Sequence, residues 1–130
     1  MTRELENVHA IDPSQLLQAL GEGVYGVDRA GRTTFLNPTA ERVLGWTYSE
    51  LAGRVQHEVV HHSRLDGSPH PINECPVHGV MASGRPARVS SDVFWTKAGK
   101  PVPVEYTATP LFENGAIAGA VVAFRDITQE

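Results

Sequence analysis

GVDRAGRTTFLNPTAERVLGW, residues 26–46, decides the fold of this 130-residue chain. The stretch contains parts of two apolar segments on either side of a glycine turn, and Asn37-Pro38 follows them directly. Apolar segments around a turn are typical of a β-hairpin, and an asparagine before a proline is typical of a helix start. We therefore predict a hairpin formed by residues 23–28 and 32–37, followed by a short helix.

Further local signals predict two more short helices. Thr47-Tyr48-Ser49-Glu50 has the form of a capping box, so a second very short helix is expected before residue 52. Pro76 marks the start of a third helix, and Gly84 marks its end. Residues 54–74, between these helices, carry turn signals, and we expect them to be irregular.

Three strands are expected at the end of the chain. Apolar residues alternate with polar ones over 89–95 and over 102–108, and Asn114-Gly115 is a strong hairpin signal. The segment 116–124 is apolar on both faces, so we expect it to be the central strand. With a first helix starting at Asp12-Pro13, this order predicts an α+β domain, an antiparallel sheet with helices on one face.

Composition excludes several classes of function. The length allows one domain, and the net charge of −4 comes with no Lys/Arg patch of the kind that binds nucleic acid. A single cysteine favours a reducing compartment, so we expect a cytoplasmic location. The longest apolar run, residues 115–124, is far below the ~20 residues that span a bilayer, so we expect no membrane insertion by this domain.

Four segments in order resemble the PAS domain family: residues 26–46, YSELAG (48–53), TKAGKPVPVEYTATPL (96–111) and GAVVAFRDIT (119–128). The resemblance covers roughly residues 14–128. It implies a five-stranded antiparallel sheet, short helices on one face over a small pocket, and an N-terminal capping helix. We expect residues 1–12 to be a flexible lead-in, 13–128 to be the PAS domain and 129–130 to begin a truncated linker.

The resemblance also implies a role in signal transduction rather than catalysis. PAS domains sense ligands, light, gases or redox state, and many form dimers. We expect a bacterial sensory module that binds a small ligand or a partner, homodimerises and signals to an output domain of a larger protein, such as a histidine kinase of a two-component system, a diguanylate cyclase or a transcription regulator. The alternatives are a ligand-free interaction scaffold and a haem- or flavin-dependent redox sensor.

If strand parity follows the family, one set of mostly apolar side chains faces the cavity and suits a small organic or aromatic ligand. The alternative is that these side chains form a core and fill the cavity themselves. The set consists of Tyr25, Val27, Val77, Met81, Phe94, Val104, Tyr106, Val122 and Phe124.

The two ends of the domain carry the candidates for signalling. Asp126 and Thr128 match the family's Asp-x-Thr ending, which couples the sheet to an outgoing helix, and either side chain could cap that helix. Leu16, Leu17 and Leu20 lie at helical spacing and are candidates for a dimer helix. Packing of these leucines on the domain's own sheet is the alternative.

HHSRLDGSPHPINECPVHG, residues 61–79, together with His57 holds five of the six histidines and the only cysteine. We interpret this segment, 57–78, as a variable lid over the pocket, with no bound metal. The alternative is a metal site at Cys75 and His78, with other loop histidines as further ligands. A second hypothesis is a pH-sensitive lid, because histidines titrate near neutral pH.

We predict no cofactor, although haem at His78 and a flavin stay open as alternatives. The photoactive flavin motif of the family is only echoed at residues 73–77, because its arginine and glutamine are missing. A Cys75–His78 thiolate pair lacks a visible third group, and Asp92 is expected on a solvated face, as are Glu105 and Glu113. We therefore predict no catalytic residues.

Overall fold

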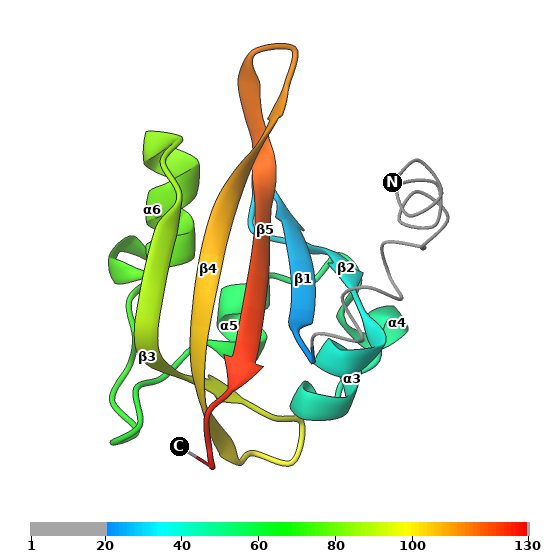
Figure 1. Cartoon of the computed structure of the whole chain (residues 1–130), viewed down its shortest axis with the longest axis vertical. Coiled ribbons are helices and arrows are strands. Elements are labelled where there is room, and N and C mark those ends of the chain that lie inside the picture. Colours follow the sequence, from blue (N-terminus) through cyan, green and yellow to red (C-terminus); the bar gives the residue numbers. More distant parts are fainter. Residues whose placement is uncertain (1–20, 130) are drawn as a thin grey trace, which may run out of the picture.

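The computed structural model describes residues 21–129 and shows a five-stranded antiparallel sheet in the order β2-β1-β5-β4-β3 (Figure 1). The helices lie behind this sheet in Figure 1, on one face. The predicted α+β class is therefore confirmed; the expected capping helix and the lead-in 1–12 lie outside the described residues. The strands are β1 (Gly23–Asp28), β2 (Thr33–Leu36), β3 (Ala87–Trp95), β4 (Pro101–Glu113) and β5 (Ala116–Asp126).

Five short helical segments connect β2 to β3. They are α3 (Pro38–Leu44), α4 (Tyr48–Leu51), α5 (Gln56–Val60), the 3₁₀ turn η1 (Ile72–Glu74) and α6 (Pro76–Ser83). The starts predicted at Pro38, Tyr48 and Pro76 are confirmed. Within residues 21–129, no helix is long and apolar enough to cross a bilayer.

Asn37 joins the first hairpin to α3. Its Oδ1 accepts a hydrogen bond from the backbone N–H of Ala40, which caps the helix, and another from that of Val24 in β1, each at 2.9 Å. Its Nδ2 donates to the carbonyl of Glu22 at 3.0 Å. The side chain is buried, so a single residue fixes both the helix start and its position against the sheet.

The central strand is β5, as its apolar sequence predicted. Ala120, Val122 and Phe124 are buried on its inner face, where they join the core formed with β1, β4 and the helices. Asn114 and Gly115 both have positive φ, 53° and 80°, as the two-residue turn between β4 and β5 requires. The expected hairpin is confirmed.

The expectation of irregular structure over residues 54–74 was wrong. α5 and η1 occupy parts of it, although neither has a side-chain cap. Contacts from elsewhere hold α5 instead: Val60 and Gln56 are buried, and Thr33 of β2 donates to the Gln56 side chain at 2.5 Å. A five-residue helix is too short to show helical periodicity, so no periodic pattern indicated α5.

The strict alternation expected along β3 was also wrong. The register shifts between Val89, which pairs with Tyr106, and Asp92, which pairs with Val104. Because Tyr106 and Val104 both point into the core, this bulge turns Asp92 inward as well. Asp92 therefore does not lie on a solvated face, and this corrects the sequence-based expectation.

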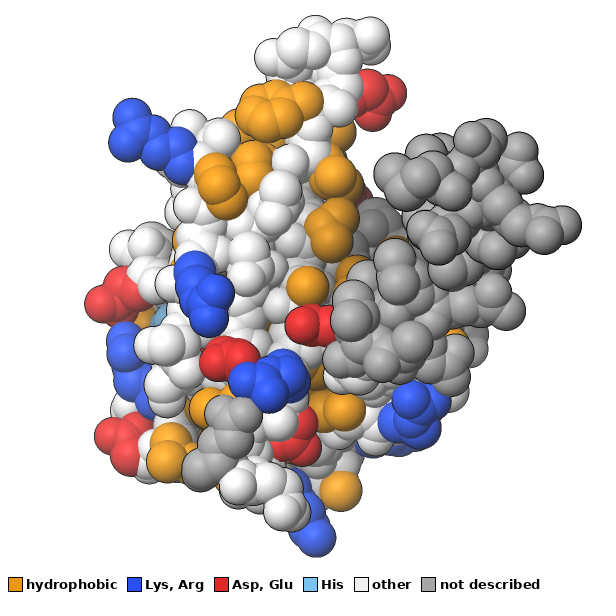
Figure 2. Space-filling view, in the orientation of Figure 1, with side chains coloured by type: hydrophobic (Ala, Val, Ile, Leu, Met, Phe, Trp, Pro, Cys, Tyr) orange, Lys and Arg blue, Asp and Glu red, His pale blue; other side chains and the backbone are white. Residues whose placement is uncertain are grey.

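The outer face of the sheet divides into two parts. Charged side chains lie across its middle, where Arg125 of β5 pairs with Glu105 of β4. Hydrophobic side chains gather toward the β4–β5 turn (Figure 2), and Leu111 and Phe112 at this end of β4 are exposed. The buried core and the cavity described below lie on the opposite, helix-covered face.

Candidate functional site

A cavity of about 130 Å³ lies between β1, α5 and α6. We call it the α5–α6 pocket. One wall is apolar and consists mainly of Tyr25, Val27, Val77 and Met81. The polar part of the lining consists mainly of His57, His61 and Cys75.

Four of the nine residues predicted to face a cavity line this pocket. Tyr25 and Val27 come from β1, and Val77 and Met81 come from α6. The other five are packed in the core and are absent from the pocket lining: Phe94, Val104, Tyr106, Val122 and Phe124.

Aromatic rings fill the space beneath the pocket. The ring centroid of Phe94 lies 6.1 Å from that of Tyr25 and 5.3 Å from that of Phe124. The remaining cavity of about 130 Å³ is smaller than the roughly 300–1,000 Å³ typical of cofactor sites.

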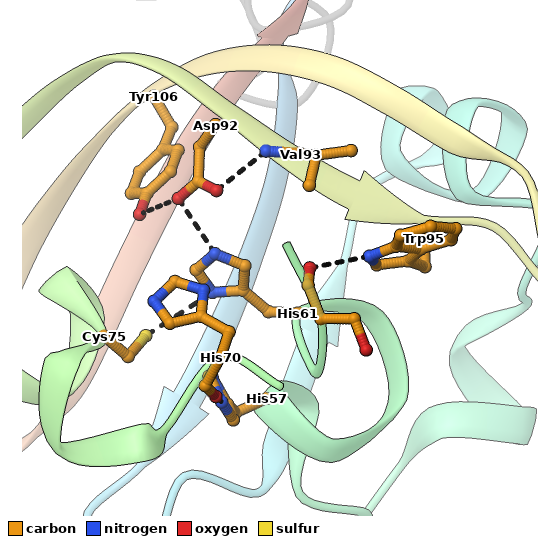
Figure 3. A network of polar contacts seen from close by, with 9 residues as sticks. His57, His61, His70, Cys75, Asp92, Val93, Trp95 and Tyr106 are labelled. Atoms are coloured by element: carbon orange, nitrogen blue, oxygen red, sulfur yellow. Dashed lines mark hydrogen bonds and ion pairs between the residues drawn. The ribbon is translucent and has the colours of Figure 1, made fainter. Parts of the chain in front are cut away.

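His61 lies at the centre of a buried polar chain (Figure 3). Its Nε2 is 2.8 Å from Oδ2 of Asp92, and the same carboxylate oxygen accepts a hydrogen bond from the Tyr106 hydroxyl at 3.0 Å. Its Nδ1 is 3.4 Å from Sγ of Cys75. The imidazole is only 1% exposed, so these contacts lie away from bulk water.

His57 approaches the same thiol from one turn earlier on α5. His61 directly follows α5, and its ring centroid lies 5.2 Å from that of His57. The Nε2 of His57 is 2.6 Å from the backbone carbonyl of His70. Its Nδ1 is buried and has no hydrogen-bond partner among the described residues.

Burial and neighbouring charged groups have opposite effects on the pKa values of the residues in this buried polar chain. Burial disfavours the charged form of His61, but hydrogen bonds with Asp92 and Cys75 outweigh it and raise the pKa of His61 to about 9. Burial likewise opposes ionisation of Cys75, but the nearby imidazoles of His57 and His61 outweigh it and lower the pKa of Cys75 to about 5.

The pKa values of Asp92 and Tyr106, at the sheet end of the buried polar chain, also depend on burial and on neighbouring groups. Burial works against the Asp92 carboxylate, but the hydrogen bond from His61 outweighs it and holds the pKa of Asp92 below its usual value. Burial, reinforced by the Asp92 charge, raises the pKa of the Tyr106 phenol. Tyr106 therefore stays protonated and donates its hydroxyl proton to Asp92.

Two sets of these side chains have the spacing of a metal site. In His57, His61 and Cys75, one ligand atom from each residue lies within 4.8 Å of the others, and the same holds for His61, His70 and Asp92. The cysteine named in the sequence-based alternative is therefore in a cluster, but its partners are His57 and His61. His78 belongs to neither set.

The histidines of the loop thus separate into different environments. His61 is buried, whereas His62 and His78 are exposed. His62 stacks on Trp95 at a centroid distance of 5.7 Å, and the Trp95 indole donates to the carbonyl of Ser63 at 2.8 Å. The pH-sensitive lid stays a hypothesis, and its histidines do not share one environment.

The end of the sheet shows a compact turn at the predicted relay. Asp126 is the last residue of β5, and its Oδ1 accepts hydrogen bonds from the backbone N–H of Thr128, at 2.9 Å, and from the Thr128 hydroxyl. The N–H of Ile127 donates to the carbonyl of Pro103. Asp126 therefore closes a turn that leaves the sheet. The proposed dimer residues Leu16, Leu17 and Leu20 lie outside the described residues.

Sequence reasoning missed Asp92, and it named His57 and His61 only among the loop histidines that could add ligands to a site at Cys75 and His78. The His57–His61 spacing of four was visible, but it gains meaning only once residues 56–60 are known to be helical. No sequence signal marked the bulge in β3 that brings Asp92 to His61.

Comparisons with known proteins agree on one family. A family model described as "PAS fold" matches residues 11–127. The probable diguanylate cyclase DgcE of Escherichia coli (strain K12) is 32% identical over 114 residues, which cover 87% of this chain and 10% of that protein. The chain thus spans about a tenth of the length of this curated relative.

Solved structures show the same fold. The PAS domain of a protein from Colwellia psychrerythraea aligns with a TM-score of 0.72 at 18% identity and covers 90% of this chain and 95% of that one. The PAS domain of nitrogen regulation protein NR(II) from Vibrio parahaemolyticus aligns with a TM-score of 0.69 at 19% identity, over 90% of this chain and 99% of that one.

Proposed function

The chain belongs to the PAS fold family, and we propose that it is a sensory module of a bacterial signalling protein. It binds a small organic ligand in the α5–α6 pocket and passes a conformational signal to an output domain. A diguanylate cyclase is the output that the named relative suggests, and a histidine kinase or a transcription regulator are the other candidates. Homodimerisation through Leu16, Leu17 and Leu20 and a cytoplasmic location are parts of the same proposal.

One observation carries this proposal: a buried polar chain links the pocket wall to the sheet. His61 lines the pocket and contacts Asp92 of β3, which in turn accepts from Tyr106 of β4. Tyr106 pairs with Phe124 of β5, two residues before Asp126. A ligand that moves His61 would therefore change the Asp92–Tyr106 contact between β3 and β4. Because β4 pairs with β5, this change would reach the strand that ends at Asp126.

A ligand shifts such an equilibrium only by its difference in affinity between the two conformations. His61 is suited to this role because its ring faces the pocket on one side and the Asp92 carboxylate on the other. Spatial continuity alone does not establish coupling, so the proposal needs a measurement at the far end of the chain of contacts.

The test uses phenol as a probe, because one aromatic ring with one hydroxyl suits a small apolar pocket with a polar wall. We expect phenol to shift the amide NMR signals of Val27 and Val77 and also those of Asp126 and Thr128. The Tyr106→Phe variant keeps the ring and loses the hydroxyl contact, so phenol should still shift the pocket signals but no longer those of Asp126 and Thr128.

The control is Tyr48→Phe, which removes a phenol hydroxyl from an exposed ring of α4 and should leave both responses intact. If phenol shifts the pocket signals of the unmodified chain but never those at Asp126 and Thr128, the relay is wrong. If no signal in the pocket responds to phenol, and native mass spectrometry finds no bound small molecule, the ligand-free scaffold is the better description.

A further inference from the structure

We propose that His57, His61 and Cys75, which we call the Cys75 cluster, bind a thiophilic divalent transition-metal ion such as Zn²⁺. The ligand atoms are Nδ1 of His57, Nδ1 of His61 and Sγ of Cys75. This inference goes beyond the proposed function and does not depend on an organic ligand or on the relay.

The hydrogen bonds of the two imidazoles fix which nitrogens are free. The carbonyl of His70 can only accept a hydrogen bond, so the Nε2 that contacts it belongs to the N–H side of His57. The Asp92 carboxylate places the N–H of His61 on Nε2 in the same way. In the neutral rings, both Nδ1 atoms therefore carry lone pairs.

The Cys75 cluster therefore has fewer hydrogen-bond donors than acceptor atoms. One proton lies between Sγ of Cys75 and Nδ1 of His61, which are 3.4 Å apart, while Nδ1 of His57 is buried without a hydrogen-bond partner among the described residues. Buried polar atoms without partners are rare and call for an explanation. A metal ion between the three atoms would satisfy all of them, because imidazole nitrogen and thiolate sulfur are the ligands that Zn²⁺ prefers.

The distances suit such an ion. A tetrahedral zinc ion with bonds of about 2.0–2.3 Å holds its ligand atoms roughly 3.3–3.8 Å apart. The separation of 3.4 Å between Cys75 and His61 already falls in this range. All three ligand atoms lie within 4.8 Å of one another, so a small movement of a side chain would complete the geometry.

The surrounding groups also match a metal site. Histidine ligands usually donate their second N–H to a carboxylate or a backbone carbonyl, which orients the ring and strengthens the metal bond. The Asp92 carboxylate holds the N–H of His61 in this way (Figure 3), and the His70 carbonyl holds that of His57. The second set of candidate ligands, His61, His70 and Asp92, would instead require the His61–Asp92 hydrogen bond to break.

An entry path and an open coordination position are available. All three residues of the Cys75 cluster line the α5–α6 pocket, so an ion can reach them from that side. Three protein ligands leave a fourth tetrahedral position for water or for a donor atom of a pocket ligand. The site would therefore hold an ion that a second molecule can still reach.

The direct test is a titration of the untagged full chain, after treatment with a chelator, with Co²⁺ as a spectroscopic substitute for zinc. We expect one Co²⁺ per chain, with a thiolate-to-cobalt absorption band and the d–d bands of a tetrahedral site. Zn²⁺ should displace it with the same stoichiometry. A chain that takes up neither ion at one equivalent overturns the proposal.

Variants locate the site. Cys75→Ser should remove the thiolate band, and His57→Gln or His61→Gln should weaken Zn²⁺ binding by more than about 100-fold. Asp92→Asn should weaken it by roughly 10–100-fold and shift the d–d bands while the thiolate band remains, as expected of a positioning residue. The matched control is His78→Gln, which changes a histidine of the same pocket outside the cluster and should bind Zn²⁺ normally.

A labelling experiment decides the matter even if a variant fails to fold. Cys75 is the only cysteine in the chain, so iodoacetamide reports on it alone. One equivalent of Zn²⁺ should slow its alkylation at least tenfold. If the rate is unchanged, Cys75 and His61 form a metal-free thiolate pair and the proposal is wrong. Phenol binding is measured separately, so either proposal can fail while the other stands.

Discussion

Two neighbouring segments of the chain are built in different ways. Residues 37–53 form α3 and α4, whose starts are capped by side chains of the same segment, Asn37 and Thr47. Residues 54–75 form α5, η1 and the loop between them, and their helical turns have no side-chain caps. This second segment depends on side chains that reach distant strands.

The two segments therefore differ in whether local or long-range contacts hold them in place. The helix starts of the capped segment are specified by short local patterns. The second segment is held by contacts such as His61–Asp92 and Trp95–Ser63, which span 31 and 32 positions in sequence. Its position therefore follows the sheet, and a ligand that alters these contacts would move it.

The largest effect in this comparison is expected at Asn37. Asn37→Ala removes the cap of α3 and leaves the N–H of Val24 buried without its partner, which should lower the free energy of unfolding by about 2–4 kcal/mol. Urea denaturation followed by circular dichroism measures it.

Thr47→Ala is the matched control, because it removes an exposed cap from α4 and should lower the free energy of unfolding by only about 0.5–1 kcal/mol. Equal losses for the two variants would mean that Asn37 acts as a local cap alone, with no added contribution from its bond to β1.

A smaller and more local effect is expected at Asp92. In the metal-free protein, Asp92→Asn keeps the size of the side chain but removes the charge that His61 contacts, so the opening free energy of α5 should fall by about 1–2 kcal/mol. Hydrogen exchange of the backbone amides of residues 57–61 measures this opening, while exchange in α3 should change little.

Glu105→Gln is the control for Asp92, since it removes a carboxylate of the outer face and should leave exchange in α5 unchanged. If α3 and α5 become more open by the same amount in Asp92→Asn, the two segments are one cooperative unit and the contrast between them is lost.

The smallest effect concerns Glu50, a partly exposed residue of α4 that pairs with Lys97 at the surface. The hydrogen bond from Lys97 is the main reason why the pKa of Glu50 falls from 4.5 to about 2. Because the folded pKa is lowered, the stabilisation is present above pH 4.5 and is lost as the pH falls toward 2. Solvent screens this exposed pair, so its contribution to stability is small.

Carbon-13 NMR of the Glu50 carboxyl measures this titration. Lys97→Ala should move the midpoint from about 2 back toward 4.5, whereas Arg64→Ala, which removes the partner of Glu74, should not move it. A midpoint that stays low without Lys97 would assign the shift to the backbone of the Thr47 cap instead.

Local patterns predicted most of the sheet and three helix starts. Asn37-Pro38, the Thr47–Glu50 capping box and Asn114-Gly115 each act through neighbouring backbone atoms, so their meaning does not depend on the rest of the fold. α5 was missed because its five residues are held by burial of Val60 and by the Thr33–Gln56 contact, which no local pattern encodes.

The residues of the candidate site were also predicted only in part. Tyr25, Val27, Val77 and Met81 were placed near a cavity by family resemblance and strand parity, and they line the pocket. Five other residues of that set pack in the core, because the rings of the sheet fill the space beneath the helices. Strand parity gives the face of a side chain, but it does not give the volume that remains beside it.

The sequence alone predicted the order of the five strands, three helix starts and the central position of β5, because periodicity, caps and turns act over a few residues. Only the tertiary structure decided that Cys75 meets His57 and His61 and that Asp92 turns inward to reach the same imidazole. Those contacts depend on a bulge in β3 and on the way α5 packs against it, and both arise from balances of burial among distant residues.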